Sequence, residues 1–192
     1  MARPSVREQI ISAGLDTLHR SGFNASSVQD ITDAAGVPKG SFYNHFESKE
    51  TLGAEAVLRY VEGSRPRLAV LRDTKLAPLS RLRAYFEDLC QTFEQSRYSR
   101  GCLLGNFGAE LSDQSPLIRD RVARAFASWS EIVAKVIAEA QAAGTVSTDF
   151  PPEVLAALVI NGWEGAVLRA KVDKSRVPLD QFLAVTFAKV LA

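Results

Sequence analysis

The sequence predicts an all-α fold of about nine helices. Apolar residues recur at intervals of three and four along most of the chain, and no segment shows the alternating pattern of a β-strand. Serine, proline or glycine stands where these segments begin or end, as expected at helix termini. With 192 residues, 46% of them hydrophobic, and a net charge of +1, the chain is long enough for one or two compact domains.

The first three expected helices lie within the first fifty residues. An amphipathic segment at residues 6–21 ends at Gly22, and Ser27 is placed to cap a second helix through its side-chain oxygen. Gly36 follows the last apolar position of that helix, where a left-handed residue often ends a helix. Pro38 then fits the start of a third helix, because its ring fixes a helical φ and it has no N–H to satisfy.

The third helix is short and carries side chains that suit a phosphate-lined groove. Phe42 and Phe46 lie four residues apart and form its expected buried face. The other side chains are cationic, hydroxyl, amide and imidazole groups, which can reach phosphate oxygens and base edges. The candidate DNA contacts of this segment are Lys39, Gly40, Ser41, Tyr43, Asn44 and His45. Ser48 caps a fourth helix and places Lys49 in its first turn, where the helix dipole favours a phosphate.

Residues 22–50 combine several short motifs: Gly22-Phe23, Ser27-Val28, Asp30-Ile31, Ala34-Ala35-Gly36-Val37, Lys39-Gly40-Ser41-Phe42-Tyr43, His45-Phe46 and Ser48-Lys49-Glu50. In this combination the stretch resembles the tetracycline-repressor (TetR/AcrR) family of bacterial transcription regulators. The resemblance implies a three-helix DNA-binding domain at residues 1–47 and a ligand-binding and dimerisation domain at 48–192. The family's DNA-contacting positions would be Ser27, Lys39, Ser41, Tyr43, His45 and Lys49. Many relatives have threonine in place of Ser27, and either residue supplies a hydroxyl.

The resemblance and the helix pattern together predict a ligand-responsive homodimer, with repression as the family's usual mode. Two third helices set about 34 Å apart would meet successive major-groove faces of a near-palindromic operator. A small-molecule effector in the C-terminal domain would favour a conformer with another spacing, and the DNA would be released. The effector and the operator cannot be identified from the sequence.

The charge of the N-terminal segment is not basic overall. Residues 1–60 contain six Lys and Arg against seven Asp and Glu, so any positive face must be local. Affinity for DNA grows with the number of phosphates that a protein neutralises. We therefore expect few phosphate contacts per subunit and a modest salt dependence, with Arg3 and Arg7 adding to the positive face.

Beyond the third helix the pattern predicts six more. Pro66 is expected to kink or restart the first of these, and Gly144 to end the longest. The expected ranges are 48–72, 78–93, 102–111, 116–143, 152–171 and 178–191.

The last two helices are expected to form a dimer interface. Both carry more apolar surface than a lone domain can bury, and pairing across a two-fold axis into a four-helix bundle would bury the rest. The expected interface residues are Leu155, Val159, Trp163, Val167, Phe182 and Phe187. The alternative is an ordinary core within one chain.

The effector pocket is expected among the middle helices, since ligand cavities are mostly apolar with a few directing polar groups. The candidate lining residues are Tyr85, Leu89, Cys102, Phe107, Glu110, Phe126, Trp129, Asn161 and Trp163. The alternative is core packing for the apolar members and a solvated or capping role for Glu110.

One cysteine invites a further interpretation. The segment Arg100-Gly101-Cys102-Leu103 resembles that of TetR-family regulators that sense electrophiles and oxidants, and a helix N-terminus near an arginine lowers the pKa of a thiol. Two alternatives remain for Cys102: it packs as a small hydrophobe, or the segment resembles that of related regulators that bind small acids or other effectors instead. Packing is the expectation for Cys90. A disulfide between the two stays open, because the sequence does not show whether their Cα atoms approach.

Other function classes find little support. An enzyme would have only His19 and His45 available for a hydrolase triad or a histidine metal site. There is no Walker loop, and Gly105-Asn106-Phe107-Gly108 lies in a helical stretch without the strand of a dinucleotide-binding fold. No catalytic residue, metal site or cofactor is predicted. An all-α interaction or carrier protein is the second alternative, but it would not need the side chains of the third helix exposed together.

The expected location is the cytoplasm, with no attachment to a membrane. Basic residues at the N-terminus are not followed by an apolar run, and no segment has the roughly 20 apolar residues of a membrane span. Two cysteines without framework spacing also suit a reducing interior.

Overall fold

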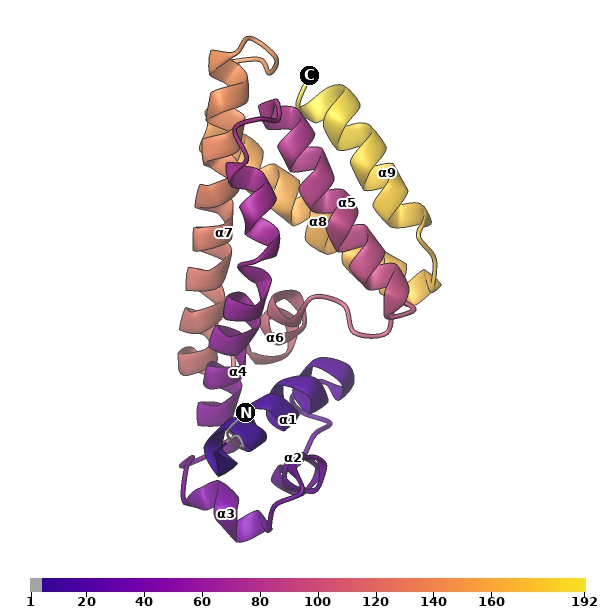
Figure 1. Cartoon of the computed structure of the whole chain (residues 1–192). Coiled ribbons are helices and arrows are strands. Elements are labelled where there is room, and N and C mark those ends of the chain that lie inside the picture. The colour runs from indigo at the N-terminus through magenta and orange to yellow at the C-terminus, as the bar shows by residue number, and fades with distance from the viewer. Residues whose placement is uncertain (1–4) are drawn as a thin grey trace. The chain divides into compact units, whose positions relative to one another are not determined.

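The computed structural model describes residues 5–192, which form helices and no strand. The predicted all-α fold is confirmed: this range contains nine α-helices, one 3-10 helix and one π-helix. In chain order they are α1 (Val6–Ser21), α2 (Val28–Ala35), α3 (Lys39–Tyr43), α4 (Lys49–Ser64), η1 (Arg67–Arg72), α5 (Pro78–Gln95), α6 (Leu103–Leu111), α7 (Pro116–Ala142), α8 (Pro152–Asp173), α9 (Val177–Val185) and η2 (Thr186–Val190) (Figure 1).

The chain divides into two compact units. The first unit contains residues 1–63 and 102–125, and the second contains residues 64–101 and 126–192. Helices α1 to α3 and α6 therefore belong to the first unit, whereas α5, α8 and α9 belong to the second. This division follows internal contacts, and the functional division between residues 1–47 and 48–192 stays a prediction.

Serine side chains cap the starts of α2 and α4, as the sequence predicts. The Ser27 Oγ accepts the backbone N–H of Asp30 at 3.1 Å, and the Asp30 carboxylate accepts the N–H of Ser27 at 2.7 Å. This reciprocal pair is a capping box. Ser48 and Thr51 form a similar pair at the start of α4, with distances of 3.1 and 2.9 Å. Each cap contributes about 1 kcal/mol to helix stability.

Glycine ends α1 and α2 in conformations that other residues rarely adopt. Gly22 has a φ of +88° and Gly36 has a φ of +67°. After the turn at Gly36, the N–H of Val37 reaches back to the carbonyl oxygen of Thr32 at 3.1 Å. This glycine turn directs the chain from α2 into α3.

The core of the first unit joins the N-terminal helices to α4, α6 and the start of α7. A Cβ on Gly53 of α4 would lie 2.9 Å from Ile118 and 3.0 Å from Phe23, so α4 packs closely against both. The rings of Phe23 and Phe107 meet edge to face, with centroids 5.9 Å apart. The fully buried side chains of this core include Ile10, Leu18, Ile31, Phe42 and Leu52.

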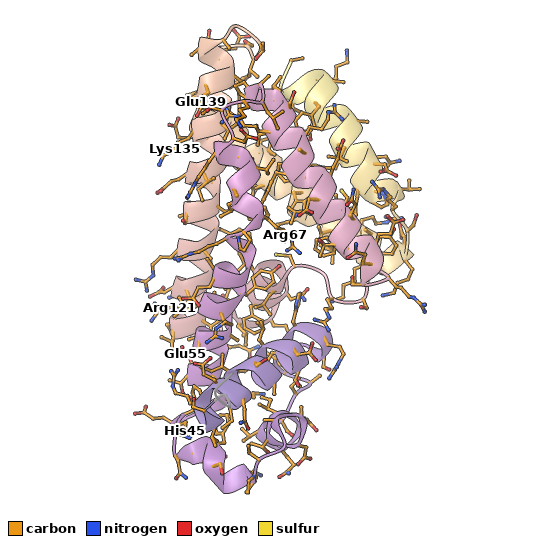
Figure 2. All side chains as sticks on the ribbon, in the orientation of Figure 1. His45, Glu55, Arg67, Arg121, Lys135 and Glu139 are labelled. Atoms are coloured by element: carbon orange, nitrogen blue, oxygen red, sulfur yellow. The ribbon has the colours of Figure 1, made fainter. Side chains whose placement is uncertain are left out.

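Aromatic rings fill the centre of the second unit. The three rings that meet there, with centroids 5.3 to 5.5 Å apart, are Phe86 of α5, Trp163 of α8 and Phe182 of α9. The buried guanidinium of Arg81 donates to the carbonyl oxygen of Leu71 at 2.9 Å and pairs with Glu139 of α7 (Figure 2). These polar contacts hold η1 and α7 against α5.

Helix boundaries follow the prediction, with two local features. The segment expected over 48–72 ends as α4 at Ser64 and resumes at Arg67, with Pro66 at the N-cap of η1, so Pro66 does interrupt it. The last expected helix ends as a π-helix over Thr186–Val190. The spacing of apolar residues does not distinguish the hydrogen-bond pattern of a π-helix from that of an α-helix. No helix in residues 5–192 has the length and apolar character needed to cross a membrane.

Candidate DNA-binding site

Aromatic side chains anchor the inner face of α3. Phe42 is fully buried, Phe46 is nearly so, and their ring centroids lie 5.5 Å apart. The chain makes a further turn after α3, since the N–H of Phe46 donates to the carbonyl oxygen of Phe42 at 2.9 Å. Both phenylalanines therefore occupy the buried face that the sequence predicts, and the outer face is left to solvent.

The outer face of α3 and the two residues after it carry most of the predicted DNA-contacting groups. Tyr43 is 58% exposed although it is aromatic, and His45 lies just beyond the end of α3 (Figure 2). The exposed members of the predicted set are Lys39, Gly40, Tyr43, Asn44 and His45, and Ser41 is half-buried. A cation, a phenol, an amide and an imidazole thus share one short exposed segment, from which they can reach phosphates and base edges.

Ser27 has a structural task at the start of α2. Besides accepting an N–H, its hydroxyl donates to the Asp30 carboxylate at 2.7 Å. Hydrogen bonds from Ser27 hold the pKa of the Asp30 carboxyl below its usual value. The bond from the backbone N–H of Ser27 has the larger effect, and the bond from its hydroxyl has the smaller one. The single hydroxyl proton of Ser27 is engaged with Asp30, so a phosphate oxygen would have to compete for it.

Lys49 is tied to the loop between α1 and α2. Its Nζ donates to the carbonyl oxygens of Phe23 at 2.9 Å and Ser26 at 2.7 Å, and it lies 4.2 Å from the centroid of the Phe23 ring. Burial lowers the pKa of Lys49, and the charge of Glu110 opposes that shift. The sequence predicts a phosphate contact for Lys49 and gives no sign of this tie, because the two carbonyls lie more than twenty residues away in the chain.

Glu110 of α6 holds the same loop. Its carboxylate accepts the backbone N–H of Asn24 at 2.9 Å, and a Cβ on Gly22 would lie only 2.7 Å from it. Both contacts lie within the first unit. Glu110 therefore holds this loop through its carboxylate, and a place for it in an effector pocket stays a prediction.

Cations near α1 are paired with carboxylates. A guanidinium nitrogen of Arg7 lies 3.4 Å from the carboxylate of Glu55 on α4 (Figure 2). Arg59 pairs with Glu8 at 2.5 Å. Arg3, the other residue predicted to add to the positive face, lies outside the described residues. These pairs leave fewer cations to neutralise phosphates, in keeping with a small number of backbone contacts.

The predicted effector residues are divided between the two units. Those of the first unit are Cys102, Phe107 and Glu110, and those of the second are Tyr85, Leu89, Phe126, Trp129, Asn161 and Trp163. The ring centroids of Tyr85 and Trp129 are 6.4 Å apart, and the indole N–H of Trp129 is buried without an acceptor among the described residues. Trp163 lies in the aromatic core, and Asn161 is exposed on α8.

An open hollow of about 450 Å³ lies elsewhere on the second unit. It is lined by Pro66, Arg67, Val70, Ala84 and Asp88, from η1 and α5. Arg67 (Figure 2) pairs with Asp88 at 3.1 Å beside it. None of the predicted effector residues lines this hollow.

The predicted dimer residues mostly face inward within one chain. The buried ones are Leu155, Val159, Trp163 and Val167 of α8 and Phe182 of α9, and Phe187 is half-buried. For the five buried residues the assignment to an interface is therefore corrected: they lie in the core of the second unit, where the rings of Phe86 on α5 and Phe182 on α9 meet Trp163 on α8. The intrachain core, which was the alternative, holds for these five residues. Phe187 stays a predicted interface residue.

A second apolar face of α8 is left exposed. Val154, Leu158, Leu168 and Val172 are 52%, 54%, 64% and 69% exposed. Together with two further exposed positions they follow intervals of four, three, four, three and four residues, which is one face of a helix. We call this face the α8 stripe; it consists of Val154, Leu158, Asn161, Gly165, Leu168 and Val172.

Both cysteines are buried and neither is in a disulfide, so Cys90 and Cys102 are not bonded to each other. Cys102 stands at the N-cap of α6, as predicted, and is 5% exposed. The Tyr60 hydroxyl donates to its Sγ at 3.8 Å. Cys90 is fully buried on α5, and burial raises the pKa of its thiol to about 11. Cys90 is therefore a packing residue, and sensing through Cys102 stays a hypothesis.

Two protein families match the chain, one in its N-terminal part and one in its C-terminal part. Residues 10–56 match the family described as bacterial regulatory proteins, tetR family, and residues 78–186 match the tetracyclin repressor-like C-terminal domain. The two matches cover the helix-turn-helix region and most of the second unit.

Relatives that align with nearly the whole chain are also named as transcription regulators. The chain is 41% identical over 192 residues to the HTH-type transcriptional repressor DhaR of Mycobacterium sp. (strain GP1), with 100% of this chain and 95% of the relative covered. It is 36% identical to the transcriptional regulator AcuR of Cereibacter sphaeroides, covering 91% of this chain and 80% of the relative. The crystal structure of regulatory protein TetR from Rhodobacter sphaeroides superposes with a TM-score of 0.88 at 35% identity, over 94% of this chain and 96% of that one.

These family members are transcription regulators and not enzymes, which confirms the interpretation of the sequence as that of a transcription regulator. Both family matches, the identity to full-length relatives and the shared fold lead to one conclusion: the chain belongs to the TetR family of bacterial regulatory proteins.

Proposed function

We propose that this protein is a homodimeric repressor whose α3 reads a near-palindromic operator and whose second unit binds a small-molecule effector that releases the DNA. The observation that carries the proposal is the exposed set on α3. Lys39 and Tyr43 on α3, and His45 just beyond it, are exposed, and buried Phe42 fixes the helix to the core. Such a rigidly held set of donors suits direct contact with phosphates and base edges.

Dimerisation is proposed through the α8 stripe. A row of exposed apolar side chains on a helix is costly in water, and a second copy related by a two-fold axis would cover it. Gly165 lies in the middle of the stripe and leaves open space where a Cβ would stand, which allows a close approach of two helices. The pairing would form a four-helix bundle from two copies of α8 and α9.

The effector is proposed to bind in the second unit beside Tyr85 and Trp129. A buried indole N–H without an acceptor is uncommon in native proteins, and a ligand oxygen would satisfy it. An effector that favours one of two conformers by 1.4 to 2.8 kcal/mol changes DNA affinity by about tenfold to a hundredfold. One modest pocket is therefore sufficient for regulation.

Repression and a cytoplasmic location complete the proposal. The relative DhaR is itself named a transcriptional repressor, which supports the same direction of control here. A protein that reads an operator must reach the chromosome, and two free cysteines are compatible with the reducing conditions found there.

The proposal is tested by selecting the DNA that the purified protein binds, sequencing it and measuring the affinity of variants by fluorescence anisotropy. Tyr43→Ala is expected to weaken operator binding about tenfold, because it removes an exposed contact in the groove. Helicity and dimer mass should stay unchanged.

Phe150→Ala is the matched control, because Phe150 is also an aromatic residue with 58% exposure but lies in the second unit. It should bind like the wild type. Selection that enriches no two-fold symmetric sequence, or wild-type affinity for Tyr43→Ala, would contradict the proposal.

A further inference from the structure

The loop between α1 and α2 is held by charged side chains from two other helices. On one side the Glu110 carboxylate accepts the Asn24 N–H at 2.9 Å. The same carboxylate lies so close to Gly22 that a Cβ there would be 2.7 Å from it. Glu110 lies on α6 (Figure 1) and is 86 residues from Asn24 in sequence, and both residues belong to the first unit.

Lys49 holds the same loop from α4. Two of its three N–H donors are used on the carbonyl oxygens of Phe23 and Ser26. Its ammonium group also lies over the Phe23 ring, at 4.2 Å from the centroid. These contacts occupy the side chain that the family resemblance would place against a phosphate.

The loop determines where α2 begins. Ser26 is 3% exposed, and its hydroxyl donates to the carbonyl oxygen of Gly22 at 2.7 Å, so the loop is a compact turn. Ser27 follows as the N-cap of α2, and the turn at Gly36 then leads into α3. A shift of the loop would therefore move the start of α2 and, through it, the exposed face of α3.

We propose that Glu110 and Lys49 are positioning residues, a clasp that fixes the loop at residues 22–26 and thereby the α2–α3 pair, and that both support operator binding without touching DNA. This inference rests on the proposed function, since it concerns how the reading helix is held. It also connects α6 to that helix through the loop and α2.

Whether removal of the Glu110 carboxylate raises or lowers DNA affinity distinguishes a clasp from simple electrostatic repulsion. A carboxylate near a polyanion repels it, so deleting a carboxylate alone should raise DNA affinity. Loss of the clasp should lower affinity, because the α2–α3 pair would sample positions that do not fit the groove. Asp113 is an exposed carboxylate just beyond α6 and provides the charge-matched control.

The salt dependence separates a clasp from a phosphate contact for Lys49. The slope of log affinity against log salt is about −0.9 per neutralised phosphate. A lysine on a phosphate in each of two subunits therefore contributes about two to the magnitude of that slope. A positioning lysine changes the affinity and leaves the slope unchanged.

The experiment measures operator affinity by anisotropy over a salt series, with helicity, melting temperature and dimer mass recorded for each variant. Glu110→Ala and Lys49→Met should each weaken binding about tenfold at constant slope. Asp113→Ala should bind as tightly as the wild type or slightly more tightly. Lys39→Ala, the phosphate-contact control, should reduce the magnitude of the slope by about two per dimer.

Two further variants test the mechanism. Glu110→Gln keeps an oxygen that can accept the Asn24 N–H and should recover most of the affinity that Glu110→Ala loses, which also covers the case that the alanine variant does not fold. The double variant Glu110→Ala with Lys49→Met should lose less than the product of the two single losses, because both residues hold one loop.

Wild-type or higher affinity for Glu110→Ala would overturn the clasp. So would a slope reduced by about two for Lys49→Met, since Lys49 would then be a phosphate contact. If the wild type itself selects no operator, the proposed function fails and not the clasp alone. If the wild type and Lys39→Ala behave as expected while Glu110→Ala and Glu110→Gln bind alike, only the clasp fails.

Discussion

At the scale of single residues, Gly36 shows how one backbone conformation positions a site. Its φ of +67° costs a residue with a Cβ about 1 kcal/mol, because the left-handed region is strained for L-residues. A Cβ at Gly36 would meet nothing within 4 Å, so steric contact adds no further cost.

We predict that Gly36→Ala lowers the free energy of unfolding by about 1 kcal/mol, measured by urea denaturation at fixed protein concentration. Gly108→Ala is the matched control, because its Cβ would also meet nothing within 4 Å but the residue lies inside α6. That variant should be about 0.5 to 1 kcal/mol more stable than the wild type, owing to the better helix propensity of alanine. Equal effects of the two substitutions would contradict the role assigned to Gly36.

The thiol of Cys90 should be chemically silent in the folded protein. Burial raises its pKa to about 11, so only about one thiol in 10⁴ is ionised at pH 7, and the thiolate is the reactive form. In a Cys102→Ser variant, a disulfide reagent at pH 7 should label Cys90 slowly without denaturant and stoichiometrically in urea. Rapid labelling of the native variant would show that Cys90 is accessible and ionised.

At the scale of helices, α8 illustrates how a helix can be apolar on two faces. Its inner face packs on Phe86 and Phe182, and its outer face forms the α8 stripe. The composition of α8 predicts that both of its apolar faces are covered, but it does not show which face packs against the rest of its own chain. Only the observed burial assigns Trp163 to the core and Leu168 to the outside.

Leu168→Asp is predicted to shift the protein from dimer toward monomer at micromolar concentration, since two buried aspartates would face each other across the two-fold axis. Analytical ultracentrifugation measures the mass, and circular dichroism should show unchanged helicity. Leu76→Asp is the control, because Leu76 is 42% exposed but lies in the segment between η1 and α5 and is not part of the α8 stripe. A dimer of wild-type strength for Leu168→Asp would exclude the α8 stripe as the interface.

At the scale of the whole molecule, the proposed function depends on the separation of two reading helices. Two half-sites must present their major grooves on one face of the duplex, about one helical turn apart. Inserting about five base pairs between the half-sites turns one of them to the opposite face, so affinity should fall toward that of non-specific DNA.

The measurement is fluorescence anisotropy with the selected operator and two altered duplexes. The control duplex carries the same insertion outside the half-sites and should keep full affinity. If the central insertion has no effect, the two subunits do not read the operator as a unit of fixed spacing.

Local chemistry made much of the fold and of the α3 surface predictable. Serine caps at Ser27 and Ser48, the glycine turn at Gly36 and the buried pair Phe42 and Phe46 all act on neighbours within a few residues, and the structure places each as the sequence predicts. The same motifs carry the resemblance to the TetR family, which the comparisons confirm.

Long-range contacts were not predictable in the same way. Helix α8 is apolar on both sides, so the sequence pattern assigned the face that is buried within the chain to a dimer partner. The hydrogen bonds between Lys49 and the α1–α2 loop could not be predicted from the spacing of neighbouring residues. Glu110 meets Asn24 across 86 residues of chain. The sequence by itself determined the helices, their ends and the exposed reading surface, because these depend on short-range hydrogen bonds and periodicity. Only the tertiary structure decided which apolar face is covered and which charges hold the reading helices, because burial and charge pairing depend on residues that the chain brings together from a distance.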